Sequence, residues 1–171
     1  MKVLIVYSHS YQQDSVSNKA ILEELAKDPD VVIRNLEELY PTGEFDLPTE
    51  QQHLLEADAI VFQHPLFWFS VPSMLKKYMD DVFARGFTHG TGGGKLAGKK
   101  FYHSFTTGAP SDFYTEEVLK EVTASVRLSA SFCGMDYCGH ITSHGLNAYV
   151  NNEAEVVARE HATRLMKAIK G

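Results

Sequence analysis

The sequence predicts an α/β fold in which a doubly wound, five-stranded parallel sheet carries helices on both faces. Apolar, β-branched runs alternate with amphipathic segments of helical spacing, and strand followed by helix occurs five times. The first apolar run shows no polar alternation, which is typical of a strand covered on both faces. The 171 residues contain neither an internal repeat nor a linker, so residues 1–171 are expected to form one domain.

The first strand and helix are the clearest pair. The strand is expected at 2–7, where Val, Leu and Ile follow one another. A polar loop then leads to a helix at 15–27, whose apolar residues have helical spacing: Ile21, Leu22 and Leu25. Ser15 or Ser17 is available to cap this helix.

Four further pairs follow in the same order. The strands are expected at 31–36, 58–63, 99–107 and 137–142, where apolar and aromatic residues cluster. The helices are expected at 50–56, 73–85, 115–128 and 153–170, where apolar residues recur at helical spacing. In the last helix the residues expected to be buried are Val156, Val157, Leu165, Met166 and Ile169.

Composition and charge exclude several classes of protein. The net charge is −6 and no basic stripe is present, which argues against a nucleic-acid partner. No apolar run approaches the roughly 20 residues of a membrane-spanning helix, and the N-terminal run is too short for a signal peptide. We therefore expect a cytoplasmic protein. Cys133 and Cys138 match neither a zinc-site spacing nor a disulfide framework, so we expect buried free thiols and no metal site.

Five strands in a chain of this length suggest the flavodoxin-like strand order, 2-1-3-4-5. In such sheets a ligand binds beyond the C-terminal ends of the strands, near the point between the first and third strands where the order reverses. The loops at 8–18, 64–72 and 106–114 are therefore expected to converge on one site.

The first of these loops has the composition of a phosphate site. Hydroxyl and amide side chains stand beside a helix N-terminus, whose free N–H groups attract anions: Ser8, Ser10, Ser15, Ser17 and Asn18. His9 could donate to a phosphate oxygen. The same serines could simply cap the helix, and His9 could be an ordinary loop residue. Motifs of nucleotide triphosphatases and dinucleotide-binding sites are absent after the first strand.

The second and third loops favour an aromatic heterocycle with polar edges. The run from Pro65 through Leu66, Phe67, Trp68 and Phe69 offers a flat apolar wall and main-chain N–H groups, although these aromatics could also belong to the core. His64 is interpreted as serving the geometry of the loop. The third loop adds two hydroxyls, a close backbone approach and a phenol: Thr106, Thr107, Gly108 and Tyr114.

Three motifs carry a family resemblance. They are His9-Ser10 with Ser15-x-x-Asn18, then H-P-L-F-W-F-S-V-P-S-M-L-K from His64 followed by Gly86-Phe87, and then 99–108. With these, the chain from Met1 to about Tyr114 resembles the NAD(P)H quinone oxidoreductase family of flavodoxin-like proteins. Its small bacterial members include modulators of drug activity, general stress proteins and ancillary subunits of glutathione-gated potassium efflux systems. The pattern H-P-L-x-W-[FY]-x-x-P-x-x-L-K is the most specific of the three.

The resemblance implies a bound flavin, with FMN favoured over FAD because the chain lacks the longer C-terminal region of larger members. It implies a phosphate site formed by His9, Ser15, Ser17 and Asn18. It implies a ring site along Pro65, Leu66, Phe67, Trp68 and Phe69, with the N1/O2 edge of the ring at Thr106, Thr107, Gly108 and Tyr114.

The implied reaction is a two-electron, ping-pong hydride transfer from NAD(P)H through flavin N5 to a quinone, with Tyr114 as a catalytic donor. Two departures put a proton relay in doubt: Ala109-Pro110 replaces a second glycine, and no histidine occurs in 115–120. The resemblance also implies a homodimer, to which the region 67–87 would contribute.

Other functions remain open. One alternative is a regulatory ancillary subunit that binds flavin or nucleotide and makes peripheral contact with a potassium efflux transporter. Another is a one-electron carrier flavodoxin, which the match to H-P-L-x-W disfavours. An azo or nitro compound could replace the quinone, and the sequence does not separate NADH from NADPH.

Overall fold

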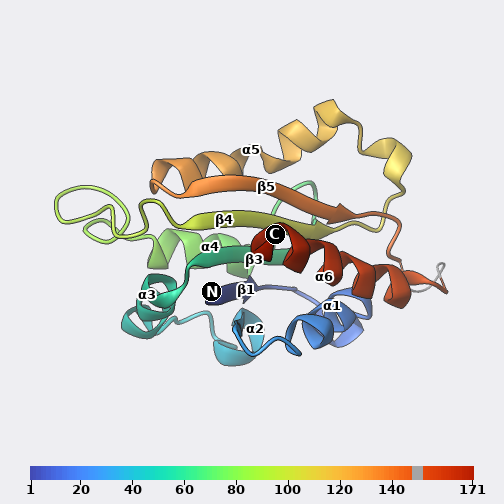
Figure 1. Ribbon diagram of the computed structural model, residues 1–171, viewed down its shortest axis with the longest axis horizontal. Helices are drawn as coiled ribbons and strands as arrows, with labels where there is room; N and C mark the ends of the chain where they lie inside the picture. The colour runs from blue at the N-terminus through green and yellow to red at the C-terminus, as the bar shows by residue number, and fades with distance from the viewer. Residues whose placement is uncertain (148–151) are drawn as a thin grey trace.

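The computed structural model describes residues 1–147 and 152–171, and over these residues it confirms the predicted sheet (Figure 1). The strand order is β2-β1-β3-β4-β5, and every neighbouring pair is parallel. The strands are β1 Val3–Tyr7, β2 Val31–Asn35, β3 Ala59–Pro65, β4 Lys100–Thr106 and β5 Asp136–Ser143. The helices are α1 Ser17–Leu25, α2 Leu36–Leu39, α3 Leu47–Glu56, α4 Ser73–Val82, α5 Glu116–Phe132 and α6 Ala154–Lys170.

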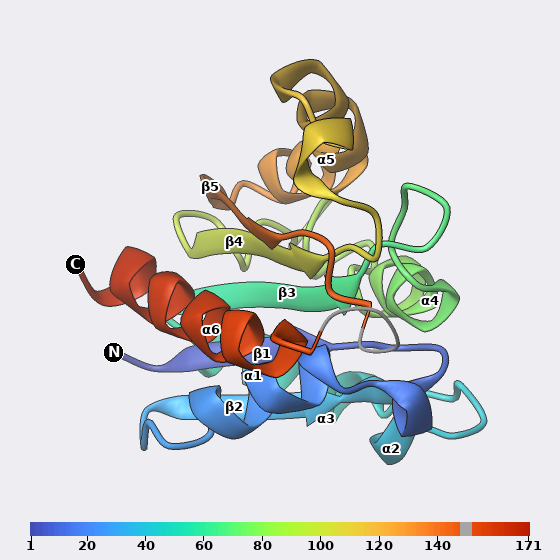
Figure 2. The same cartoon turned by 90° about the vertical axis from the view of Figure 1, so that its right-hand side faces the viewer.

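Helices cover both faces of the sheet, as a doubly wound fold requires. On one face α1 and α6 pack against each other, and they are seen together in front of the strands in Figure 2. On the other face α3, α4 and α5 supply the apolar residues of a second core. The central strands are therefore buried on both sides; β1, for example, is buried at every position.

The boundaries of the first helices differ from the prediction for reasons of capping. α1 begins at Ser17, and neither Ser15 nor Ser17 caps it, because Val16 occupies the N-cap position and no side chain bonds there. α3 begins at Leu47, three residues before the predicted start, because the Asp46 side chain accepts a hydrogen bond from the Thr49 amide. The short helix α2 directly continues β2 and was not predicted.

Two burial predictions are wrong. Val156 is exposed on α6, because the buried face of that helix is centred on Ala158, Ala162 and Leu165. Cys138 is exposed on the edge strand β5, whereas Cys133 is a buried free thiol as predicted. Among the described residues, no helix is both long and apolar enough to cross a membrane.

The sheet polarity places the termini and the loops of interest at opposite ends of the molecule. Lys170, next to the C-terminus, pairs with Asp28 and Asp30 near the start of β2, and the N-terminal ammonium pairs with Asp30. The loops after β1, β3 and β4 leave the sheet at the other end, because parallel strands all finish there.

Candidate functional site

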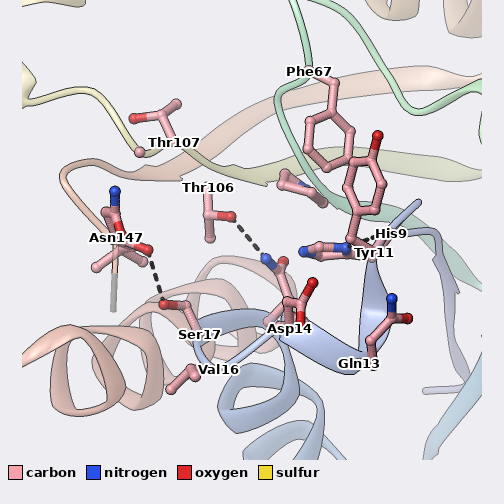
Figure 3. A pocket seen from close by; sticks show the side chains of 15 residues that line it. His9, Tyr11, Gln13, Asp14, Val16, Ser17, Phe67, Thr106, Thr107 and Asn147 are labelled. Atoms are coloured by element: carbon pink, nitrogen blue, oxygen red, sulfur yellow. Dashed lines mark hydrogen bonds between the residues drawn. The ribbon is translucent and has the colours of Figure 1, made fainter. Parts of the chain in front are cut away.

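A cavity of about 640 Å³ lies at the C-terminal end of the sheet, over β1, β3 and β4. Figure 3 shows His9, Tyr11 and Phe67 gathered on one side of it and Ser17 and Asn147 on the other, with Thr106 between them. The cavity is lined by His9, Tyr11, Gln13, Asp14, Ser15, Val16, Ser17, Asn18, Pro65, Phe67, Thr106, Thr107, Gly108, Leu146 and Asn147. The three loops predicted to converge therefore do meet here.

The N-terminus of α1 gives the cavity an anion-attracting end. The first backbone bond of the helix joins the Ala20 amide to the Val16 carbonyl at 3.1 Å, so the amides of 17–19 have no partner within the helix. The Ser15 hydroxyl is buried and lacks a well-formed hydrogen bond among the described residues. Because a buried hydroxyl whose neighbour, the Tyr7 hydroxyl, does not form a well-aligned hydrogen bond is costly, this group fits an acceptor that the cavity would receive from outside. The Ser17 hydroxyl is already used, since it donates to the Leu146 carbonyl at 3.3 Å.

His9 lies on the Phe67 side of the cavity and is a neutral donor (Figure 3). Its Nδ1 accepts the Tyr11 amide at 3.1 Å, which leaves the proton of the neutral ring on Nε2. Burial lowers the pKa of His9, so the neutral ring is favoured. The ring is held edge-on against Phe67, with 5.6 Å between centroids. His9 can thus donate one hydrogen bond without carrying a charge.

The loop after β3 makes a tight turn. Phe67 and Ser70 exchange both backbone hydrogen bonds at 3.0 Å, and the central residues Trp68 and Phe69 have φ of 49° and 62°. Positive φ at both central positions is the pattern of a type I′ turn, and it is unusual for bulky residues. In the part of the chain that the structure describes, the Trp68 and Phe69 amides make no hydrogen bond, so both are free to donate.

The predicted ring-wall residues divide between two cavities. Pro65 and Phe67 line the large cavity. A second cavity of about 440 Å³ adjoins it and shares Phe67 and Gly108; it is also lined by Leu66, Trp68, Phe69, Ala109, Phe113 and Tyr114. The Trp68 side chain is 94% exposed, so it stands at the rim of this second cavity and contributes little to a buried wall.

Thr106 and Thr107 differ in what their hydroxyls can do. The Thr106 oxygen accepts the Asn18 side-chain amide at 2.9 Å, and its own hydrogen has no acceptor within residues 1–147 and 152–171. Thr107 donates to the Ala109 carbonyl at 2.9 Å and accepts from His144 Nδ1 at 3.0 Å. The Thr107 hydroxyl is therefore occupied within the protein, whereas Thr106 keeps a donor for a ligand.

His144 was not predicted from the sequence, yet it packs directly on Tyr114. The two rings stack with 4.6 Å between centroids and 16° between planes. Burial, Arg164 and His140 lower the pKa of His144, which favours the neutral ring. Its position after β5 is the one signal that could have found it, because that loop also leaves the sheet at the site end. Leu146 and Asn147 were missed in the same way, whereas Tyr11 lies in the predicted 8–18 loop but was not named among its site residues.

His64 forms a buried pair with His103 beneath the turn, on the face covered by α4 and α5. His64 Nδ1 bonds to the Pro65 carbonyl at 2.9 Å, and its Nε2 lies 2.8 Å from His103 Nε2. A carbonyl only accepts, so His64 carries its proton on Nδ1 and accepts the His103 proton at Nε2. Burial lowers the pKa of His64 to about 4 and holds that of His103 well below its usual range. His64 thus fixes the Pro65 end of the loop, in agreement with the geometric role expected for it.

Comparisons with known proteins agree with the fold. The profile of a family described as having a flavodoxin-like fold matches residues 1–168. A glutathione-regulated potassium-efflux system ancillary protein KefG from Enterobacter sp. (strain 638) is 38% identical over 141 residues, which cover 80% of this chain and 77% of that protein.

Two solved structures resemble the whole fold. General stress protein 14 from Treponema denticola, solved in complex with FMN, has a TM-score of 0.87 and 29% identity over 98% of this chain and 99% of that one. An NADPH-quinone reductase from P. pentosaceus has a TM-score of 0.80 and 23% identity over 95% and 98% of the two chains, a likeness of fold. The chain therefore belongs to the family of flavodoxin-like fold proteins to which its sequence motifs pointed.

Proposed function

We propose that the protein binds FMN and is an NAD(P)H:quinone oxidoreductase of the cytoplasm. The observation that carries this proposal is a cavity with an anion-attracting helix N-terminus on one side and the apolar Pro65 and Phe67 with the Thr106 hydroxyl on the other; the adjoining smaller cavity adds the free Trp68 and Phe69 amides. A phosphate on a flat heterocycle has this same division of chemistry. The FMN complex of the structurally similar general stress protein 14 supports FMN as the ligand.

The residues at the helix end suit a phosphate in their hydrogen-bond donors, while the Asp14 carboxylate also lines the cavity. The amides of 17–19, the Ser15 hydroxyl and His9 Nε2–H would hold it, with Asn18 nearby on the wall of the cavity. Among the described residues that line this cavity there is no Lys or Arg, so the dianion would depend on neutral donors and the helix dipole.

The residues at the other end suit the ring. Pro65 and Phe67 would pack on it, while the Thr106 hydroxyl and the Trp68 and Phe69 amides would donate to its polar edges. A bound flavin supplies two-electron hydride transfer, so the chain needs only to bind, orient and exclude water. The smaller cavity beside Tyr114 would receive the nicotinamide and then the quinone.

Replacing Ser15 with Ala is expected to change stability and binding in opposite directions. The apo protein should gain about 1 kcal/mol of unfolding free energy, because a buried hydroxyl without a good partner is removed. FMN affinity should fall about tenfold through the loss of a hydrogen bond to phosphate. Urea unfolding of the apo protein and fluorescence titration with FMN would measure both. A variant that loses stability would contradict the assignment of this hydroxyl to a ligand.

Tyr114 is proposed as the catalytic donor, with His144 holding its ring in place. Replacing Tyr114 with Phe keeps the stacked ring and removes only the hydroxyl. We expect hydride transfer to slow about tenfold or more, because a donor to developing charge is lost, while FMN affinity changes less than about twofold. Stopped-flow reduction by NADPH would measure the rate. An unchanged rate would remove Tyr114 from the reaction.

The proposal as a whole is tested by the visible spectrum of the purified protein. The protein is saturated separately with FMN and with FAD, and NADH or NADPH is then added without oxygen. We expect FMN to bind and its absorption band to bleach, and a quinone to restore the band. Failure to bind either flavin would refute the flavin site, and bleaching without reoxidation by a quinone would refute that acceptor. Azo and nitro compounds serve as alternative acceptors in the same assay.

A second function is favoured by the 38% identity to KefG over 80% of the chain. We propose it as the alternative: a flavin-binding ancillary subunit that makes peripheral contact with a potassium efflux transporter. This function predicts flavin binding with slow quinone turnover. Deleting the gene would then alter potassium efflux more than resistance to quinones, whereas the oxidoreductase predicts the reverse order.

The protein is also proposed to act as a homodimer. Trp68 is 94% exposed and Phe69 52%, and Phe69 stacks on Phe113, so a group of aromatic side chains is exposed at the rim of the smaller cavity. Exposed apolar groups of this kind mark interfaces. Replacing Trp68 with Asp should shift sedimentation from dimer to monomer, because a charge would be buried there. A dimer of unchanged stability in this variant would exclude Trp68 from the interface.

A further inference from the structure

Polar side chains replace apolar ones on a single face of the sheet, close to the cavity. On the face covered by α1 and α6, the residues nearer the start of β3 and β4 are apolar or aromatic, as at Val61 and Tyr102. Two residues further along, the same face carries Gln63 and Ser104, and Thr106 follows. All three are buried, so each must be satisfied by another protein group or by a ligand.

These residues form one chain of hydrogen bonds that begins at the cavity. The Asn18 amide donates to the Thr106 oxygen at 2.9 Å. Asn18 Oδ1 in turn accepts from the Gln63 side-chain amide at 2.8 Å. Gln63 Oε1 accepts the Ser104 hydroxyl at 2.6 Å.

The chain continues into α6 and ends at an exposed arginine. Ser104 Oγ lies 2.7 Å from His161 Nε2, and His161 Nδ1 lies 3.0 Å from Ser143 Oγ. Arg164 donates to Ser143 Oγ at 2.7 Å and also to the Thr142 carbonyl at 2.9 Å. His161 is fully buried, so it has no access to water.

The donor and the acceptor of every hydrogen bond in this series are fixed. Arginine has no acceptor, so Ser143 accepts from Arg164, and its own hydrogen is directed to His161 Nδ1. The Ser104 hydrogen is used on Gln63, so Ser104 must accept from His161 Nε2–H. Burial lowers the pKa of His161 to about 3, which keeps the ring neutral and in this tautomer near neutral pH.

These fixed hydrogen-bond directions determine the role left to the Thr106 hydroxyl. Its oxygen already accepts from Asn18, so its hydrogen is left for the cavity that Thr106 lines. We propose that Arg164, Ser143 and His161 are positioning residues that orient the Thr106 hydroxyl as a donor toward an acceptor atom of the ligand. This inference rests on the proposed flavin site. It assigns to Thr106 a carbonyl oxygen or an unprotonated ring nitrogen of the flavin.

The neighbouring Thr107 serves as the contrast. Its hydroxyl is saturated by Ala109 and His144, so it has no hydrogen for the ligand. Of the two adjacent threonines, Thr106 alone is connected to α6 through the chain from Asn18 to Arg164. A ligand that placed a hydrogen-bond donor at Thr106 would be disfavoured, because two hydrogens would face each other.

A double-mutant cycle with FMN tests whether α6 acts through Thr106. Replacing Thr106 with Val should weaken FMN binding about tenfold, and Thr106→Ser should restore most of it. Replacing Arg164 with Met removes the donor that fixes the Ser143 hydroxyl, and replacing His161 with Gln changes the link between Ser143 and Ser104. Each substitution alone should weaken FMN binding about threefold. In the Thr106→Val background neither should weaken binding further. Losses that multiply in the double variants would overturn the inference.

A matched control separates this role from ordinary packing. Tyr102 also links the sheet to α6, because its hydroxyl donates to the Ala168 carbonyl at 3.0 Å. It belongs neither to the series of hydrogen bonds from Asn18 to Arg164 nor to the lining of the cavity. Tyr102→Phe should leave the FMN dissociation constant unchanged. A loss equal to that of Arg164→Met would show that any loosening of α6 has this effect, and would overturn the inference.

The tautomer of His161 gives a test that needs neither a flavin nor a variant. In a nitrogen-15 NMR spectrum of the unmodified protein between pH 5 and 8, we expect the proton on Nε2 and none on Nδ1. A proton on Nδ1 would reverse the chain and overturn the inference. Absence of FMN binding by the unmodified protein, with His161 in the expected tautomer, would instead count against the proposed flavin site.

Discussion

Lowering the pH from 7 to 5 is expected to cost the folded protein several kcal/mol of stability, because three histidines are buried as neutral rings. His64 and His103 form a pair on one face of the sheet, and His161 lies on the other face. Burial lowers the pKa of His64 to about 4 and that of His161 to about 3, and it places that of His103 well below its usual range.

The sign of the effect follows from the protons bound in each state. An unfolded histidine has a pKa near 6.5. Below that pH these histidines bind protons in the unfolded chain but not in the folded protein. Stability is therefore complete above about pH 6.5 and is lost as the pH falls toward the folded pKa of about 4 for His64. Each buried histidine contributes up to about 1.4 kcal/mol per pH unit across this window.

The measurement is the free energy of unfolding in urea at several pH values from 7 to 5. Replacing His64 with Gln should reduce the slope by about one proton, and replacing His161 with Gln should do the same. Because the two residues lie on opposite faces of the sheet, the double variant should lose about two protons of slope. A slope identical in the parent and in both variants would contradict the assignment.

The fold was predictable because its signals are local. β1 and β3 read as uninterrupted apolar strands since both of their faces are covered, and five such runs separated by helical patterns leave few alternative topologies. The errors fall where a local pattern had two solutions. α2 was missed because four residues are too few for a periodic signal, and Val156 was misplaced because a long amphipathic helix allows more than one buried face.

Only the site residues that belong to sequence motifs could be predicted. The loops after β1, β3 and β4 were expected to meet, and Ser15, Asn18, Phe67 and Thr106 do line one cavity. The contributions of His144 and His161 were not predicted, because both residues lie far in sequence from those loops and their roles depend on which nitrogen faces which hydroxyl. Trp68 illustrates the opposite case, since its motif was evident but its exposure depends on a turn with positive φ.

Replacing Val16 with Asp is expected to weaken FMN binding on the order of 100-fold, provided that the helix end of the cavity holds the phosphate. Val16 lines the cavity at the N-cap position of α1 and is 45% exposed, so a carboxylate there can be tolerated by the fold. It would lie close to a dianion, and repulsion between like charges at this range is worth about 2–3 kcal/mol at an intermediate dielectric constant. Fluorescence titration with FMN at low salt would measure the loss.

Val16→Asn is the matched control, because it has the shape of Asp without its charge, and its effect on affinity should stay within about threefold. The Asp variant should also be slightly more stable than the parent without ligand, since a negative charge near a helix N-terminus is favourable by about 0.3–1 kcal/mol. Raising the salt concentration should recover part of the lost affinity through screening. Equal losses in the Asp and Asn variants would indicate a steric effect and would move the phosphate away from α1. An unequal loss that shrinks with salt, in a protein made more stable, requires an anion bound at this helix end.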